Sequence, residues 1–268
     1  MFPVLPEYSG VVQFLSPGAV VFFLLAGILF LPATDAALVE FAFLCGRPEV
    51  ADEAGRLPVG PRVILLEKTG RECPASAVER AASAAVRIAD SDGRIPALRG
   101  VLRRWAAGRG EDAIRFAVAA RIDDSRRSEL IHAVYEGWAE ADPGAAARSF
   151  HSLGQRWVQS ALSGLLRVWA SGRPAEAAVW AGSLPGCHGG RQDSPVGVES
   201  MAGFSWVTGM RLCREDVMKA VAWYWARTDE SAVRAWARSQ SEALRTELDE
   251  FIRQGASRRG STSIRRNG

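Results

Sequence analysis

The chain has 268 residues, of which 48% are hydrophobic and 24% are charged, and its formal net charge is +3. This composition is that of an ordinary globular protein with one or two domains and a sizeable core. The small net charge argues against a dedicated nucleic-acid-binding protein, which normally presents a dense basic surface. The four cysteines and three histidines do not stand at zinc-ligand spacing, so the sequence predicts no metal site and no other cofactor.

Residues 1–34 form a hydrophobic N-terminal segment that has no charged residue between Tyr8 and Thr34. A helix from Gly10 to Leu31 would be long enough to cross a bilayer core of about 30 Å. We therefore expect an N-terminal hydrophobic helix that serves as a single-pass membrane anchor. Other interpretations stay open: a secretory signal peptide, which would place the body of the protein in the periplasm or outside the cell, a buried apolar helix, or a wrongly assigned start codon.

Residues 35–73 carry weaker patterns. The stretch from Asp35 to Cys45 is apolar with two acidic residues and is compatible with a short amphipathic helix. The following sequence, GRPEVADEAGRLPVGPR, is rich in glycine and proline and is typical of a connector. The short VILLEK run does not distinguish a strand from the start of a helix. This region is expected to be a linker or an imperfect first repeat.

Residues 74–254 contain four similar segments, each centred on a tryptophan that alanine follows. The residue five positions before the tryptophan is always small, and the residues four and eight positions before it are apolar. These offsets mark one face of an α-helix, so a first helix is predicted to end just past each tryptophan. The small residue would let a neighbouring helix approach closely, and the tryptophan would fill the space between helices. The four anchoring tryptophans are Trp105, Trp138, Trp169 and Trp225.

A second helix is predicted after a short break behind each tryptophan. In one copy Asp142 and Pro143 supply an N-cap acceptor and a first-turn proline. An aromatic residue on the second helix follows the tryptophan by 11 or 12 residues. These aromatic residues are Phe116, Phe150, Trp180 and Trp236.

The repeating unit is therefore predicted to be a helical hairpin. The tryptophans are spaced by 33, 31 and 56 residues, and the first two spacings match helix-pair repeats. The third contains an insertion near residues 182–213 or a degenerate repeat. One hairpin cannot cover its own apolar face, so the sequence predicts an all-α protein with a right-handed stack of about four hairpins, a short α-solenoid. Residues 255–268 are expected to be a disordered basic tail.

One copy carries a more specific resemblance. Its motif consists of Trp138, Ala139, Asp142, Pro143, Ala145 and Ala146. It is similar to the W-A-x-x-D-P-x-A-A-x-x-W repeats of bacterial proteins, many of which are membrane-anchored or exported, and the region from Pro74 to Gln254 resembles tetratricopeptide-like α-solenoids. The Leu-Gly pair of the standard tetratricopeptide pattern is missing. The resemblance therefore implies the architecture and not the peptide-binding residues of that family.

The resemblance implies a non-enzymatic scaffold, tethered to a membrane or exported across it, that binds a protein or peptide along the groove between successive first helices. One alternative is an enzyme or small-molecule binder that uses Cys187, His188, Arg191 and Asp193 of the insertion. Another is a fragment of a longer repeat array. His132 lies off the apolar stripe and is expected at the surface or in the groove. No residue is assigned a catalytic role.

Overall fold

The computed structural model describes residues 35–186 and 212–263, with side chains as far as Arg258. These residues form twelve α-helices and one short 3-10 helix, and they contain no strand. The all-α prediction is therefore confirmed for the described part of the chain. The buried side chains of all these helices form one continuous hydrophobic core. Residues 1–34 and 187–211, which hold the expected anchor and most of the insertion, lie outside the described residues.

The region expected to be a linker or imperfect repeat is helical. It holds α2 (Ala36–Leu44), α3 (Val50–Arg56) and α4 (Val59–Arg71). The glycine- and proline-rich stretch forms α3 and the first turn of α4, so the expectation of a connector was wrong. Pro61 lies in that first turn, where its missing N–H would have no helical partner in any case. The VILLEK run lies inside α4 and is not a strand.

The remaining helices continue to the end of the described residues. They are α5 (Val78–Ala85), α6 (Ser91–Ala119), α7 (Asp124–Ala141), α8 (Pro143–Arg148) with the 3-10 turn η1 (Ser149–Ser152), α9 (Gln155–Gly172), α10 (Pro174–Ser183), α11 (Arg214–Ala226), α12 (Glu230–Arg238) and α13 (Glu242–Ser263). The anchoring tryptophans lie on α6, α7, α9 and α11. We call α7, α9, α11 and the part of α6 before Arg109 the first helices. The second helices are α8, α10, α12 and the rest of α6.

Each first helix ends in the same backbone conformation. The residue four positions after the anchoring tryptophan leaves the helical region, with φ between −147° and −136° and ψ between 63° and 96°. Inside α6 this residue forms a kink, and elsewhere it separates two helices. The four residues are Arg109, Asp142, Arg173 and Asp229. The break is thus fixed by its distance from the tryptophan and not by one residue type.

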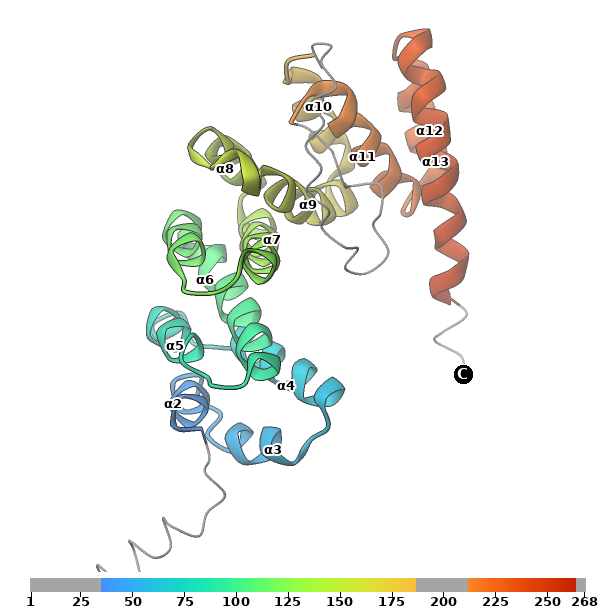
Figure 1. The fold of residues 1–268 in the computed structure, drawn as a ribbon. Coiled ribbons are helices and arrows are strands. Elements are labelled where there is room, and N and C mark those ends of the chain that lie inside the picture. Colours follow the sequence, from blue (N-terminus) through green and yellow to red (C-terminus); the bar gives the residue numbers. More distant parts are fainter. Residues whose placement is uncertain (1–34, 187–211, 264–268) are drawn as a thin grey trace, which may run out of the picture.

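The first helices pack on one another in chain order. Contacts join α4 to α6, α6 to α7, α7 to α9, α9 to α11 and α11 to α13. In Figure 1 these helices follow one another along a curve, and α5, α8 and α10 lie on its outer side. At four of these interfaces a glycine allows backbone to touch backbone, because a β-carbon on the glycine would overlap a carbonyl oxygen of the preceding helix. The pairs are Gly100 with Glu67, Gly137 with Arg103, Gly164 with His132, and Gly255 with Trp223.

The C-terminal helix extends beyond the boundary expected from the sequence. We expected a disordered tail from residue 255, but α13 continues to Ser263. Gly255 lies against the backbone of α11, and Leu248 and Ile252 are fully buried. This apolar contact with α11 holds the segment in a helix despite its polar composition. Among the described helices, none has the length and hydropathy that crossing a membrane requires.

Candidate functional site

The anchoring tryptophans lie in the core. Their exposed fractions are between 5% and 9%. Ring centroids lie 5.5 Å apart for Trp105 and Phe116, 5.3 Å for Trp169 and Trp180, and 5.7 Å for Trp225 and Trp236. These rings fasten each second helix to its first helix, and they are too deeply buried to form an open aromatic cage for a ligand.

The copy that contains Trp138 differs in its ring contacts. Phe150 stacks on Tyr135, with ring centroids 5.3 Å apart, and Tyr135 in turn lies 5.9 Å from Trp138. The Tyr135 hydroxyl shares a hydrogen bond of 2.6 Å with Ser149 Oγ, and burial raises the pKa of this tyrosine. Tyr135 therefore stands between the two predicted anchors, and the sequence pattern did not identify it.

A second set of side chains lies about half a helical turn away from the anchoring tryptophans, on the face that the second helices leave uncovered. We call it the inner stripe, and it holds the residues six and two positions before each tryptophan. Its members are Arg99, Arg103, His132, Glu136, Ser163, Arg167, Lys219 and Trp223. Because the members on one helix are four residues apart, they share one face of that helix. The inner stripe is the candidate functional surface of the described residues.

Glu136 is the centre of the inner stripe. Its side chain is only 5% exposed, yet it receives bonds from three helices. Arg103 Nη1 on α6 donates to Glu136 Oε2 at 3.0 Å, and His132 Nε2 lies 2.8 Å from Glu136 Oε1. Arg167 on α9 donates its Nε–H to the same Oε1. One carboxylate thus joins α6, α7 and α9.

The groups around Glu136 keep its carboxylate negatively charged. Burial alone would raise the pKa of Glu136, but the hydrogen bonds from His132 and Arg167 outweigh it and lower the pKa to about 2. Burial likewise acts to lower the pKa of Arg103, and the hydrogen bond to Glu140 reverses this and raises it. Both oxygens of Glu136 already accept bonds and its proton is lost far below neutral pH, so this carboxylate is unsuited to act as a general base.

Similar pairs cross the neighbouring interfaces. Arg99 on α6 lies 3.6 Å from Glu67 on α4, and Lys219 on α11 lies 2.5 Å from Glu247 on α13. Tyr224 shares a hydrogen bond with Ser163, and burial raises the pKa of Tyr224. Polar contacts therefore connect successive helices along the inner side of the curve. These pairs are partly exposed, so they contribute little to stability compared with Glu136.

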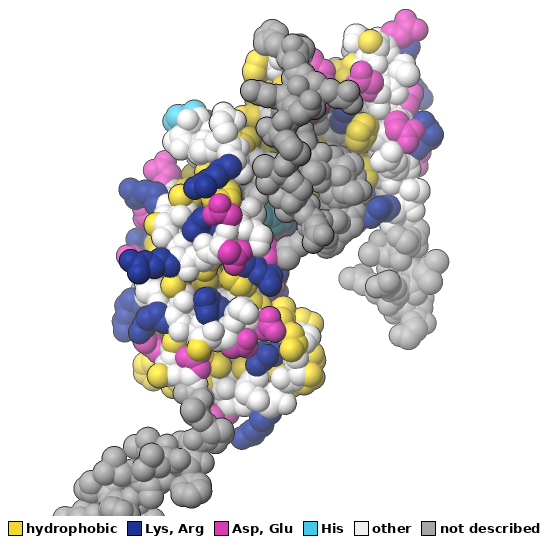
Figure 2. Space-filling model, viewed as in Figure 1, with side chains coloured by type: hydrophobic (Ala, Val, Ile, Leu, Met, Phe, Trp, Pro, Cys, Tyr) yellow, Lys and Arg dark blue, Asp and Glu magenta, His cyan; other side chains and the backbone are white. Residues whose placement is uncertain are grey.

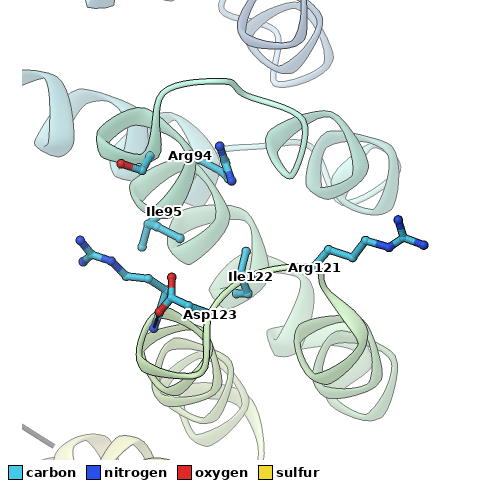
Figure 3. Close-up of a pocket in the computed structure, with 7 residues that line it drawn as sticks. Arg94, Ile95, Arg121, Ile122 and Asp123 are labelled. Atoms are coloured by element: carbon cyan, nitrogen blue, oxygen red, sulfur yellow. Dashed lines mark hydrogen bonds between the residues drawn. The ribbon is translucent and has the colours of Figure 1, made fainter.

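A cavity with a volume of about 530 Å³ opens beside the N-terminus of α6 and the segment before α7 (Figure 3). Its arginines are already engaged or turned away. Arg94 donates to the carbonyls of Ile88 at 2.7 Å and Ala89 at 2.8 Å, and Arg126 pairs with Glu129 at 2.9 Å. Figure 3 shows Arg121 pointing out of the cavity. The arrangement leaves few charges for a ligand.

The other candidate residues from the sequence are only partly described. Cys187, His188, Arg191 and Asp193 lie outside the described residues, so their arrangement is not defined. Cys213 is disulfide-bonded. Within the described ranges, no group of three or more histidine, cysteine, aspartate or glutamate side chains is placed to hold a metal ion.

Comparison of the chain with protein-family models, curated proteins and solved structures finds no significant match. The sequence pattern did not predict the inner stripe, because it was built on the small and apolar residues four, five and eight positions before each tryptophan. A usable pattern existed: the position two residues before the tryptophan holds Arg103, Glu136 and Arg167 in successive copies, an alternation of charge at one structural position.

Proposed function

We propose that the chain is a non-enzymatic interaction scaffold, a short right-handed α-solenoid whose first helices bind a protein or peptide along the inner stripe. Two recurrences support the solenoid. One is the common backbone break four residues after each tryptophan. The other is the glycine contact that joins α4 to α6, α6 to α7, α7 to α9 and α11 to α13, whose two residues are separated by 32 to 34 positions in each of these four cases. An equal separation is expected when equivalent positions of consecutive repeats meet.

The observation that carries the binding function is the inner stripe itself. It runs across successive helices and presents charged groups that are held in place by partners on the neighbouring helices. Arg99 and Arg167 keep 36% and 41% of their side chains exposed while they make these contacts. Charged groups that are already ordered lose little entropy when a partner binds, and their arrangement selects partners by complementary charge.

The chemistry of the described residues favours binding over catalysis. Both oxygens of the one buried carboxylate of the inner stripe accept hydrogen bonds, and two of the arginines that line the cavity beside α6, Arg94 and Arg126, are held by other protein groups. Side chains of this kind recognise a partner and do not transfer a proton at neutral pH. The alternative enzyme on the insertion depends on residues outside the described ranges, and no specific observation favours it.

The proposal includes a membrane tether or export signal in residues 1–34. The uncharged stretch from Tyr8 to Thr34 supports it, and α2 begins only two residues later. Fractionation of a full-length chain with a C-terminal tag tests this part. A full-size band that resists alkaline extraction from the membrane supports an anchor, and a soluble band shortened by the length of the segment supports a cleaved signal. A full-size soluble band contradicts both.

Site-specific photocrosslinking in cells tests the binding surface. A photoreactive amino acid replaces Ser171 or Glu140, which continue the inner stripe by one helical turn, or replaces Val179 or Arg115 as matched controls. All four are exposed, and Val179 lies on α10 at the outer side of the curve in Figure 1. We expect a discrete crosslinked species from the two inner positions and none from the controls. Equal crosslinking at inner and outer positions, or none at any position, would contradict the proposal.

A further inference from the structure

Two cysteines outside the inner stripe face each other at the N-terminal end of the described chain. Cys45 ends α2, and Cys73 follows the last residues of α4. Cys73 Sγ donates to the carbonyl oxygen of Leu44, the residue next to Cys45, at 3.9 Å, and each thiol shifts the pKa of the other, as expected when the two side chains lie close together. Both are free and buried, with exposed fractions of 4% and 0%.

Tight turns hold these sulfur atoms in place. Gly46 adopts a left-handed conformation with φ of 72°, and Arg47 N–H donates to the carbonyl of Ala42 at 2.9 Å. This arrangement ends α2 and turns the chain sharply behind Cys45. On the other side, Arg104 Nε on α6 donates to the carbonyl of Cys73 at 3.3 Å. The two thiols are thus positioned by contacts from separate parts of the chain.

The two thiols are chemically unequal. The hydrogen bond to Cys73, together with burial, raises the pKa of Cys45. The hydrogen bond from Cys45 lowers the pKa of Cys73, burial opposes this, and the Arg104 guanidinium supports it. Thiol–disulfide exchange needs one cysteine that attacks as a thiolate and a second within reach of the resulting mixed disulfide. In this pair, Cys73 is suited to attack as the thiolate and Cys45 to resolve the mixed disulfide.

We propose that Cys45 and Cys73 are a reactive dithiol that is converted to a disulfide by a small-molecule or protein disulfide, fastening α2 to the end of α4. The Cys73 thiolate attacks one sulfur of the oxidant and releases a thiolate. Cys45, after losing its proton, then attacks the Cys73 sulfur of the mixed disulfide and releases the second thiolate. The two released thiolates take up the two cysteine protons, so one disulfide forms in the protein and one is reduced. Because Cys73 Sγ already lies against the residue next to Cys45, little movement is needed to bring the two sulfur atoms to bonding distance.

Because both thiols are buried, exchange requires transient opening of α2. This helix has only nine residues, so few backbone hydrogen bonds have to break for it to open. The bond would close a loop that contains α3 and α4 and would suppress this opening. The inference goes beyond the scaffold function and does not depend on it, since it needs only the two thiols and an oxidant.

The test treats the folded, reduced full-length chain with excess oxidised glutathione, blocks the remaining thiols with iodoacetamide in denaturant, and maps the peptides by mass spectrometry. We expect a linked peptide pair that contains Cys45 and Cys73, with neither residue alkylated, and recovery of both thiols after dithiothreitol. Circular dichroism should show the helical content unchanged. The Cys45→Ser variant should lose the link and leave Cys73 alkylated or bound to glutathione.

A Val179→Cys variant supplies an exposed thiol that reports whether the oxidant is active, because Val179 is 77% exposed. Full alkylation of Cys45 and Cys73 while this exposed thiol carries glutathione would overturn the proposal. So would stable glutathione adducts on either cysteine of the unmutated chain, or a link that forms only as the helical signal is lost. The unmutated chain gives the decisive result, so the test does not rely on a variant that fails to fold.

Discussion

The centre of the molecule and its C-terminal part use the same architecture with different chemistry on the inner stripe. In both parts a glycine touches the carbonyl of the preceding helix, at Gly137 in the centre and at Gly255 in the C-terminal part. Two residues before the tryptophan, however, the centre has the ion-paired Glu136 and the C-terminal part has Trp223, which is 1% exposed. The Arg227 guanidinium lies 4.7 Å from the Trp223 ring.

This difference distinguishes the features that set the spacing of the helices from the side chains that vary along the inner stripe. The backbone break and the close glycine contact recur where the charges do not, so they set the spacing of the helices. The inner stripe tolerates a carboxylate with three partners at one place and an aromatic ring at another. Such variation is what the proposed scaffold function requires, because each segment would contact a different part of a partner.

Replacing an anchoring tryptophan should give the largest effect in both regions. Trp169→Ala and Trp225→Ala should each lower the free energy of unfolding by about 3–5 kcal/mol, because each removes a large buried ring that packs on a second helix. Equilibrium unfolding in urea measures this, and hydrogen exchange shows which helices open first. A change within about 0.5 kcal/mol in either variant would show that the ring does not anchor the hairpin.

The next largest effect should be a pH-dependent loss of stability in the centre, where Glu136 occupies the position that Trp223 holds in the C-terminal part. Glu136 has a folded-state pKa of about 2, below the ordinary glutamate value of 4.5, so it stabilises the fold above pH 4.5 and loses this contribution as the pH falls towards 2. A shift of this size corresponds to about 3 kcal/mol. Glu136→Gln should therefore be destabilised by roughly that amount at pH 7, by less at pH 3, and should approach the unmutated chain only as the pH falls towards 2.

Unfolding in urea at pH 7, 4.5 and 3 measures whether the stability difference between Glu136→Gln and the unmutated chain becomes smaller as the pH falls. Glu140→Gln is the matched control, because its carboxylate also pairs with Arg103 but is 47% exposed. Exposed pairs contribute less than about 1 kcal/mol, so this variant should show little pH dependence. If the two variants lose equal stability, the Glu136 carboxylate is not the link between α6, α7 and α9.

Much of the fold could be predicted from the sequence because its determinants are local. The offsets around each tryptophan located α7, α9 and α11, and Asp142 with Pro143 marked the start of α8. The break inside α6 was harder to predict, because arginine does not by itself end a helix. The position of this break, at Arg109, follows from its distance to Trp105. The helix α13 beyond residue 255 depends on contact with α11, which no local pattern encodes.

The candidate site was less predictable for a related reason. Glu136 is an ordinary charged residue in the sequence, and only the packing of α6 and α9 on either side of it buries the carboxylate and supplies two arginines. Cys45 and Cys73 are likewise separated by two helices, and the turn at Gly46 brings them together. Interactions between distant residues need the positions of whole helices, whereas caps and helix periodicity need only a few neighbouring residues.

The glycine contacts should respond alike in the two regions. Gly137→Ala and Gly255→Ala each place a β-carbon against a carbonyl oxygen of a rigid helix, so each should cost about 1–3 kcal/mol. Gly182→Ala is the control, because nothing lies near its β-carbon position, and it should be neutral or more stable by up to about 1 kcal/mol. Urea unfolding provides the comparison. A tolerated Gly255→Ala beside a damaging Gly137→Ala would mean that α13 is held by side chains and not by backbone contact.

The smallest effect concerns the break between the two helices of a hairpin. Asp142 accepts a hydrogen bond from Ala145 N–H at 2.8 Å, and Asp229 accepts one from Ala232 N–H at 2.9 Å. Replacing either aspartate by alanine should cost about 1 kcal/mol, and replacement by asparagine should cost less, since its side chain still accepts the bond. Thermal unfolding of both pairs of variants measures these differences.

Arg173 occupies the same place before α10 with nearly the same backbone conformation, yet its side chain makes no capping hydrogen bond. If the break alone determines the capping geometry, Arg173→Asn should stabilise the protein by about 0.5–1 kcal/mol, because an acceptor would then face the free N–H groups of the first turn. An unchanged or lower stability would instead show that the caps at Asp142 and Asp229 depend on their own surroundings. In that case the common backbone conformation would be a consequence of helix packing and not of the cap.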